Sequence, residues 1–130
     1  MRTKDLMIGD WVKYINGRYI DIRLARIIDI EMFSEGVIFL EPIPLTPKIL
    51  EENGFTRDLK WHHCDANMDN YNVTVQLGYA NKIEYVKIVE LGKDNCVPSE
   101  RTKLYLTHIK YVHQLQHTLR LCGIKDEIVL

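Results

Sequence analysis

The feature that most constrains the fold of this chain is an amphipathic segment near its end, Tyr111 to Ile124. At about 100° per residue, one arc of a helix over this segment is apolar and the opposite arc is polar. The apolar arc carries Tyr111, Val112, Leu115, Leu119 and Cys122, and the polar arc carries Lys110, His113, Gln116, His117 and Arg120. Gly123 suits a left-handed ending, after which Ile124 would contact Leu119. The pattern predicts a helix over about 109–122 whose apolar stripe covers one face of a sheet.

A second helix is predicted over about residues 47–53. Thr46 is a favourable N-cap, and Pro47 follows at the first helical position, where its missing N–H costs nothing. Gly54 is placed to end the helix, and Phe55 can then fold back on Leu50. Because these signals agree with one another, the sequence predicts a short helix with well-defined ends.

The rest of the chain reads mainly as short β-strands. Residues 11–15 form a strand pattern, and Asn16-Gly17 is a strong hairpin signal because both positions tolerate positive φ. The return strand alternates apolar and polar residues over 19–30, with a bulge predicted near 25–27. A turn and a strand over 37–41 follow, and clean alternation returns over 71–79. We therefore predict an α+β fold, either a small curved antiparallel sheet or an SH3-like barrel with the two helices, in a single domain over residues 1–130.

Composition places the chain among ordinary globular proteins and limits its partners. Of its 130 residues, 46% are hydrophobic and 27% are charged, and the formal net charge is −1. It therefore lacks a global field that would attract nucleic acid or an anionic membrane. No run approaches the ~18 apolar residues of a membrane span, and the amino terminus lacks a signal-peptide core. The odd set of cysteines, Cys64, Cys96 and Cys122, favours free thiols, and we expect a cytoplasmic protein without membrane contact.

Three segments together resemble a known family. They are Gly9-Asp10-Trp11-Val12, Ile43 to Phe55 and Tyr111 to Gln116. They are similar to the "GNWV", "PIPLT…NGF" and "YVHQLQN" segments of a family of small proteins, without an assigned activity, found in Bacteroidetes genomes and their prophage-like elements. The chain departs from that pattern at Asp10 and His117, where the family has asparagine. The resemblance implies a shared fold and a mobile-element setting, and it implies no mechanism.

His113 and His117 have the spacing of a metal site. At i and i+4 they share one helix face, as two zinc ligands do. A catalytic zinc needs a third ligand, and the segment lacks the glutamate of the metalloprotease pattern. His62, His63, Cys64 or Asp65 could supply the remaining ligand only if their loop packs beside the helix. The favoured interpretation is an outward, solvated polar face with no metal and no cofactor, and His113 and His117 are weak candidates.

The predicted amino-terminal hairpin combines aromatic and basic residues, a composition that binds single-stranded nucleic acid by stacking and charge. The candidate residues are Lys13, Tyr14, Arg18, Tyr19, Arg23 and Arg26. The same aromatic residues also fill the cores of small barrels, and the near-neutral net charge argues against affinity driven by counterion release. Packing is therefore the favoured interpretation, and nucleic-acid binding is the alternative.

These observations favour a protein that is not an enzyme. The glycines are scattered singly, so no phosphate-binding loop is recognisable, and no carboxylate pair is singled out by spacing. We predict an accessory or protein-interaction domain, associated with a mobile element or prophage, that binds itself or another protein. The alternative is a weak nucleic-acid-binding module that uses the amino-terminal hairpin. A metal-dependent enzyme at His113 and His117 is the third hypothesis.

Overall fold

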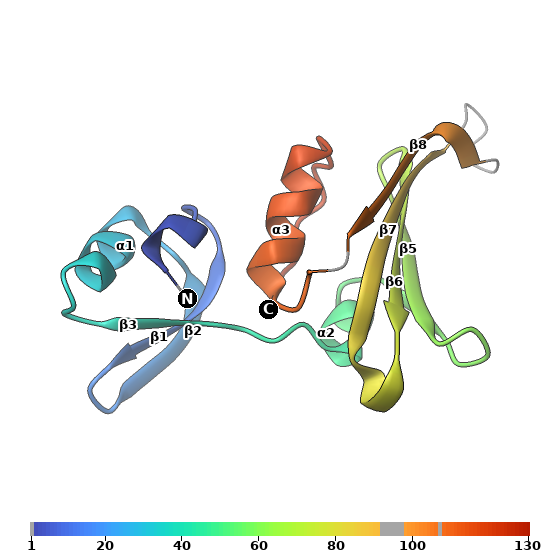
Figure 1. The fold of residues 1–130 in the computed structure, drawn as a ribbon. Coiled ribbons are helices and arrows are strands. Elements are labelled where there is room, and N and C mark those ends of the chain that lie inside the picture. The colour runs from blue at the N-terminus through green and yellow to red at the C-terminus, as the bar shows by residue number, and fades with distance from the viewer. Residues whose placement is uncertain (1, 92–97, 107) are drawn as a thin grey trace.

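The structure, a computed structural model, describes residues 2–91, 98–106 and 108–130, and its fold is α+β with two antiparallel sheets (Figure 1). The strands are β1 (Trp11–Asn16), β2 (Tyr19–Leu24), β3 (Phe39–Pro42), β4 (Thr56–Asp58), β5 (His63–Met68), β6 (Tyr71–Leu77), β7 (Ile83–Leu91) and β8 (Pro98–Leu106). The helices are α1 (Ile27–Ser34), α2 (Pro47–Glu52) and α3 (Val112–Leu121), with short 3-10 turns η1 (Thr3–Asp5) and η2 (Tyr79–Asn81).

The amino-terminal unit, residues 2–42, is a three-stranded sheet in the order β2-β1-β3 that carries η1 and α1 on one side (Figure 1). Strands β1 and β2 form a hairpin in which Asn16 pairs with Tyr19. The inner face of this sheet packs with α1 and η1 in a small core of Leu6, Val12, Tyr14, Ala25, Ile38 and Leu40. This unit therefore has a hydrophobic centre of its own, although a small one.

The larger sheet has five strands in the order β4-β5-β6-β7-β8. Strict alternation in β6 places its valines on one face, where Val73 and Val75 are fully buried. Helices α2 and α3 add their apolar side chains to this face, and the resulting main core includes Leu50, Phe55, Leu115 and Leu119. The alternation predicted over residues 71–79 thus corresponds to the central strand of the main core.

Helix α3 lies between the two sheets (Figure 1). Its carboxyl end is the predicted Schellman motif: Gly123 has a φ of +73°, and Ile124 N donates to Leu119 O at 2.9 Å. Its start is later than predicted, because the Gln114 side chain accepts hydrogen bonds from the backbone of Lys110 and Tyr111 and so caps the first turn. The amphipathic helix is therefore confirmed over 112–121 rather than 109–122.

Helix α2 ends where the sequence predicted. Thr46 Oγ1 accepts a hydrogen bond from Ile49 N at 3.3 Å, with Pro47 at the first helical position. Phe55 N donates to Leu50 O at 3.0 Å beyond Gly54, and both apolar side chains are buried. The local capping signals of this segment were sufficient to predict it.

Two fold expectations need correction. The strands form two open sheets that do not close into a barrel, so the SH3-like alternative is not confirmed. Residues 27–34 form helix α1, not the continuation of a bulged strand. The cause is local, because the buried Asp29 carboxylate accepts a hydrogen bond from Arg26 N and so caps the helix. The isoleucines of this segment also fit a strand, and this capping interaction was therefore not recognised in the sequence.

Two smaller expectations have mixed outcomes. Cys64 is buried and Cys122 is partly buried, both as free thiols, while Cys96 lies outside the described residues. None of the helices in the described part of the chain is long and apolar enough to span a membrane.

Candidate functional site

The amino-terminal unit is joined to α3 through one buried carboxylate. Asp10 is fully buried, and its side chain accepts a hydrogen bond from Met7 N at 2.7 Å. From α3, His117 Nε2 lies 2.7 Å from Asp10 Oδ2, and Arg120 Nη1 donates to Oδ1 at 3.2 Å. A buried carboxylate requires such partners, because burial removes the hydration of its charge, and only hydrogen bonds and opposite charges within the protein can replace it. The contact therefore fixes α3 against the start of β1, which Asp10 directly precedes.

Backbone groups beside Asp10 extend this junction. Gln116 Oε1 accepts from Trp11 N at 2.9 Å, and Gln116 Nε2 donates to Gly9 O at 3.1 Å, so this buried amide bridges both neighbours. The Trp11 indole donates to Ile128 O at 2.7 Å. The polar arc of α3 therefore faces the amino-terminal unit. Our expectation that this arc is solvated is wrong.

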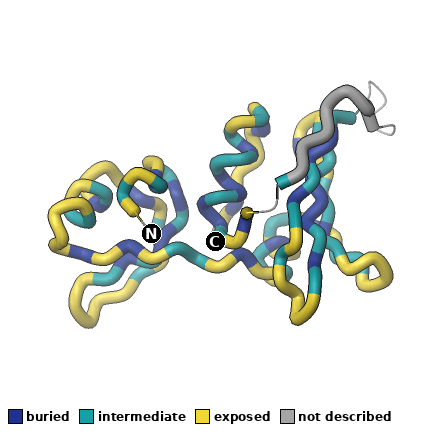
Figure 2. Tube along the Cα trace, viewed as in Figure 1, coloured by how far each residue is buried: buried dark blue, intermediate teal, exposed yellow. Residues whose placement is uncertain are grey.

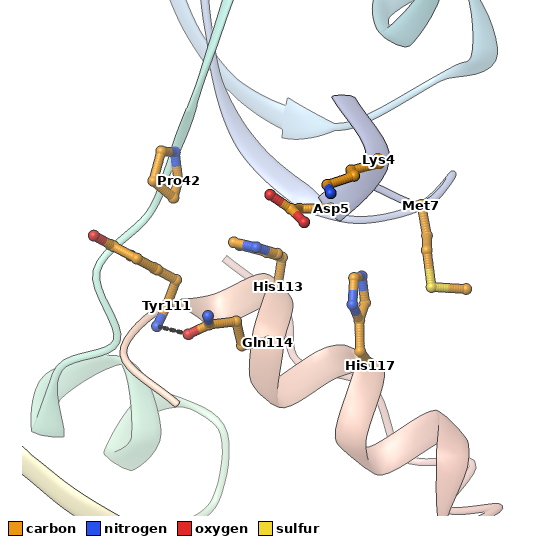
Figure 3. A pocket seen from close by; sticks show the side chains of 8 residues that line it. All are labelled: Lys4, Asp5, Met7, Pro42, Tyr111, His113, Gln114 and His117. Carbon is orange, nitrogen blue, oxygen red and sulfur yellow. Dashed lines mark hydrogen bonds between the residues drawn. The ribbon is translucent and has the colours of Figure 1, made fainter. Parts of the chain in front are cut away.

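A cavity of about 490 Å³ opens between η1 and the first turns of α3 (Figure 3). Its lining residues are Lys4, Asp5, Met7, Pro42, Tyr111, His113, Gln114 and His117. Figure 3 shows His113 and His117 directed from α3 toward η1, with Tyr111 and Pro42 at one end and Met7 at the other. Its volume lies within the range of roughly 300–1,000 Å³ that is typical of small-molecule sites.

His113 is the unusual residue of this cavity. Its side chain is 4% exposed, and Nδ1 is buried without a hydrogen-bond partner among the described residues. Burial lowers the pKa of the imidazole, and the neighbouring His117 adds to this, while the carboxylates of Asp10 and Asp5 partly oppose it. The ring is therefore neutral at pH 7 and stacks on Tyr111, with centroids 6.0 Å apart.

The structure brings together the two histidines that the sequence suggested as metal ligands. The rings of His113 and His117 lie 5.6 Å apart, centroid to centroid, at an angle of 76°. One nitrogen of His117 is already bonded to Asp10. Of the two histidines that could have completed this site, His62 is exposed, and His63 Nε2 lies 3.7 Å from Asp65 Oδ1 in β5. Within residues 2–91, 98–106 and 108–130, no group of three or more His, Cys, Asp or Glu side chains could hold a metal ion.

The aromatic and basic residues of the hairpin are largely engaged with one another. Tyr14 is buried in the small core, and the Arg23 guanidinium lies 4.0 Å from the centre of its ring. Arg26 and Arg23 lie 3.0 Å and 3.8 Å from the carboxylate of the fully buried Asp29. Burial opposes ionisation of Asp29, but the hydrogen bonds from Arg26 prevail and its pKa is lowered.

The remaining members of this set lie at the tip and the edge of the hairpin. Tyr19 is exposed beside Arg23, and Lys13 forms a 3.9 Å ion pair with Glu41. Arg18, in the turn, has no ion pair with any residue that the structure describes. The six predicted nucleic-acid-binding residues thus lie in one unit, but three of the four cations have acidic partners.

The three-stranded sheet has an exposed apolar surface that was not predicted from the sequence. Alternation in the three-stranded sheet turns six large apolar side chains away from α1. One of them, Trp11, packs against the main core, and the other five form what we call the outer face. The outer face consists of Ile15, Ile20, Ile22, Leu24 and Phe39 around the Lys13–Glu41 ion pair. Exposure of its members on β2 and β3 ranges from 45% for Leu24 to 67% for Phe39, and Figure 2 shows this hairpin largely in the exposed colour.

Comparisons with known proteins give one short match. Over 61 residues, the chain is 34% identical to a protein of Helicoverpa armigera stunt virus named methyltransferase/helicase/RNA-directed RNA polymerase. The match covers 46% of this chain and 4% of the viral protein, so the chain corresponds to a small fraction of that protein's length. No family model and no solved structure matches the chain.

Proposed function

We propose that this protein is a non-enzymatic interaction domain that works through the outer face of its three-stranded sheet. The observation that carries the proposal is the exposure of Ile20, Ile22, Leu24 and Phe39 side by side on one sheet face. Monomeric proteins rarely leave such a contiguous apolar surface in water, and patches of this kind mark protein–protein contacts. The resemblance to small proteins of prophage-like elements supports an accessory role.

The partner that best fits the outer face is a second copy of this chain. The face carries one cation and one anion at its centre, Lys13 and Glu41, on neighbouring strands. A two-fold axis that passes between Lys13 and Glu41 would place Lys13 of one copy against Glu41 of the other, and Glu41 of the first against Lys13 of the second. The charges of the outer face are therefore complementary to themselves, and its apolar residues would be covered by the same contact.

The free edge of β2 supports the same arrangement. In the order β2-β1-β3, strand β2 pairs with β1 on one side only, which leaves its other edge without a paired strand in the described residues. An apolar strand at a sheet edge is prone to associate with another strand or sheet. Self-association would therefore cover the part of the protein that is otherwise most prone to aggregation.

The test is the oligomeric state as a function of concentration, measured by analytical ultracentrifugation. We expect a reversible dimer in the wild type and a monomer for Ile22→Lys, because a lysine at the centre of the face cannot be buried without a partner. Leu59→Lys is the matched control, since Leu59 is also highly exposed but lies outside the outer face. A wild type that stays monomeric, or a dimer that survives Ile22→Lys, would refute this interface.

The charge arrangement allows a sharper version of this experiment. Lys13→Glu leaves two acidic side chains on the face, and Glu41→Lys leaves two lysines, so each variant alone should dimerise more weakly than the wild type. Mixed together, the two variants should form a heterodimer, because each cation then meets an anion across the two-fold axis. Equal dimerisation of the separate and mixed variants would contradict the proposed pairing of Lys13 with Glu41.

A further inference from the structure

The amino-terminal unit has a groove between η1 and α1, on the opposite side of the three-stranded sheet from the outer face. The groove is open and has a volume of about 420 Å³, and Figure 1 shows η1 beside α1. Four large apolar side chains line it, Leu6 and Ile8 from the segment that follows η1, and Ile27 and Ile30 from α1. Ile8 is 63% exposed and Ile27 is 61% exposed. Exposed apolar side chains that gather in one groove mark a binding surface.

One face of α1 forms a wall of this groove, and its character changes along the helix. Residues three and four positions apart lie on the same face of a helix, and the groove is lined by α1 residues with this spacing. The first turn contributes Ile27 and Ile30, whereas the end of the helix contributes Glu31, Ser34 and Glu35. The groove is therefore apolar at one end and acidic at the other.

The two carboxylates at the acidic end have no counter-charge. Neither Glu31 nor Glu35 forms an ion pair with any residue that the structure describes, and the lining of the groove contains no basic side chain among those residues. Like charges four positions apart repel each other, and the dipole at the carboxyl end of a helix favours cations over anions. The two glutamates are thus unfavourable for α1 on its own. A cation bound in the groove would relieve both repulsions.

The same charges argue against a second copy of this chain as the occupant. Two grooves that faced each other across a two-fold axis would bring four carboxylates together, and like charges across an interface oppose binding. A groove filled by a different part of a second copy would make a head-to-tail contact, which builds rings or open filaments. A closed dimer through the outer face would leave both of its grooves open to another protein.

We propose that the groove between η1 and α1 binds a peptide segment of another protein that carries a large apolar residue and a nearby lysine or arginine. The apolar side chain would pack among the four apolar residues of the groove, and the cation would pair with Glu31 and Glu35. At 1.5 Å per residue, α1 places Glu31 about 6 Å and Glu35 about 12 Å along the helix from Ile27. An extended peptide covers this span in roughly two to four residues, which sets the spacing between its apolar and basic positions.

The test begins with random linear peptides displayed on phage and selected against the immobilised full chain. We expect enriched sequences in which an apolar residue and a lysine or arginine lie roughly two to four positions apart. Ile22→Lys, which alters the outer face, should select the same sequences, so the result does not rest on the proposed dimer. No enrichment, enrichment of acidic or uncharged peptides, or loss of the sequences in Ile22→Lys would refute the groove as their binding site.

The affinity of the most enriched peptide is then measured by fluorescence polarisation. Glu31→Lys plus Glu35→Lys should weaken its binding roughly tenfold or more, because the cation of the peptide then meets lysines. Glu52→Lys plus Glu127→Lys is the matched control, because it makes the same change in net charge at exposed positions that do not line the groove. This control should leave the affinity unchanged. An equal loss in both double variants would show that net charge alone attracts the peptide and would overturn the proposal.

The charge reversal also separates a binding role from a structural one. Lysines suit the carboxyl end of α1 better than glutamates, so Glu31→Lys plus Glu35→Lys should melt at the temperature of the wild type or above it. A peptide whose basic residue is replaced by glutamate should bind this variant more tightly than it binds the wild type. The absence of that gain would overturn the pairing with Glu31 and Glu35. Self-association of Ile22→Lys that the reversal abolishes would assign the groove to a second copy and overturn the assignment to another protein.

Discussion

The two sheets of this protein differ in the face that each turns away from its covering helices. On the five-stranded sheet, that face carries polar side chains, among them Asn72, Thr74 and Gln76 of β6. On the three-stranded sheet, the corresponding outer face carries isoleucine, leucine and phenylalanine. An antiparallel sheet can present one face to water when that face is polar. The larger sheet is thus complete as a monomer, whereas the smaller one has an apolar surface left to cover.

The inner faces differ as well. The main core under the five-stranded sheet is built from apolar side chains of β5, β6, β7, α2 and α3. The amino-terminal unit has only six buried apolar residues in its core, and it encloses a buried carboxylate, Asp29, held by arginines. The small unit therefore relies more on polar contacts and on its attachment to α3. The predictions below test this contrast, beginning with the largest expected effect.

Truncating a side chain of the main core should lower the free energy of unfolding strongly, whereas truncating one on the outer face should hardly change it. Leu115→Ala removes a fully buried side chain of α3 and should lower the free energy of unfolding by about 2–5 kcal/mol. Ile22→Ala, on the outer face, should change it by no more than about 0.5 kcal/mol. Urea denaturation at a concentration where the protein is monomeric measures both. A large loss for Ile22→Ala would show that the outer face is already covered within one chain.

Removing both cations beside Asp29 tests the polar centre of the smaller unit. The double variant Arg23→Met plus Arg26→Met keeps the apolar stems but leaves a buried carboxylate poorly paired, so we expect a loss of about 1–3 kcal/mol. Arg18→Met is the control, because Arg18 has no ion pair with the described residues and should have little effect on stability.

The same variant addresses nucleic-acid binding. A gel-shift series at increasing salt should show no salt-sensitive binding of single-stranded DNA or RNA by the wild type, because most of the hairpin cations are already paired. Salt-sensitive binding that is lost in the double variant at unchanged stability would favour the nucleic-acid hypothesis over the structural role of these arginines.

The smallest expected effect concerns pH at the junction of the two sheets. Burial lowers the pKa of His113 below its ordinary value of 6.5. The unfolded chain therefore binds more protons than the folded one just below pH 6.5, so this histidine makes stability fall as the pH decreases from that value. His113→Phe should remove this part of the pH dependence, as measured by urea denaturation between pH 7.5 and 5.5. An identical slope in both proteins would show that His113 does not contribute.

Local signals in the sequence predicted some elements well and others poorly. The caps of α2 and the Schellman ending of α3 depend on residues that are adjacent in the chain, so they were predictable. The alternation of Ile20, Ile22 and Leu24 predicted a strand, but nothing in it shows that the apolar face would be the uncovered one. Helix α1 was missed because isoleucines at 27, 28 and 30 also fit a strand.

The site could not be read from the sequence because its parts lie far apart along the chain. Helical periodicity placed His113 and His117 on one face of α3, as the structure does, but the face was assigned to solvent. Its partner, Asp10, lies more than a hundred residues earlier. The structure places Asp10 and His117 in direct contact, with His117 Nε2 2.7 Å from Asp10 Oδ2.

The hydrogen bonds that close the junction span 105 to 117 residues of sequence. During synthesis, Asp10 and Trp11 emerge from the ribosome long before Gln116, His117, Arg120 and Ile128. At about 5–20 residues per second, the first strand waits several seconds or more for these partners. Throughout that interval, the carboxylate of Asp10 and the indole of Trp11 remain in water, and the amino-terminal sheet depends on its own small core. The amino-terminal sheet is therefore most vulnerable to proteases and to premature association until residues 116–128 have been translated.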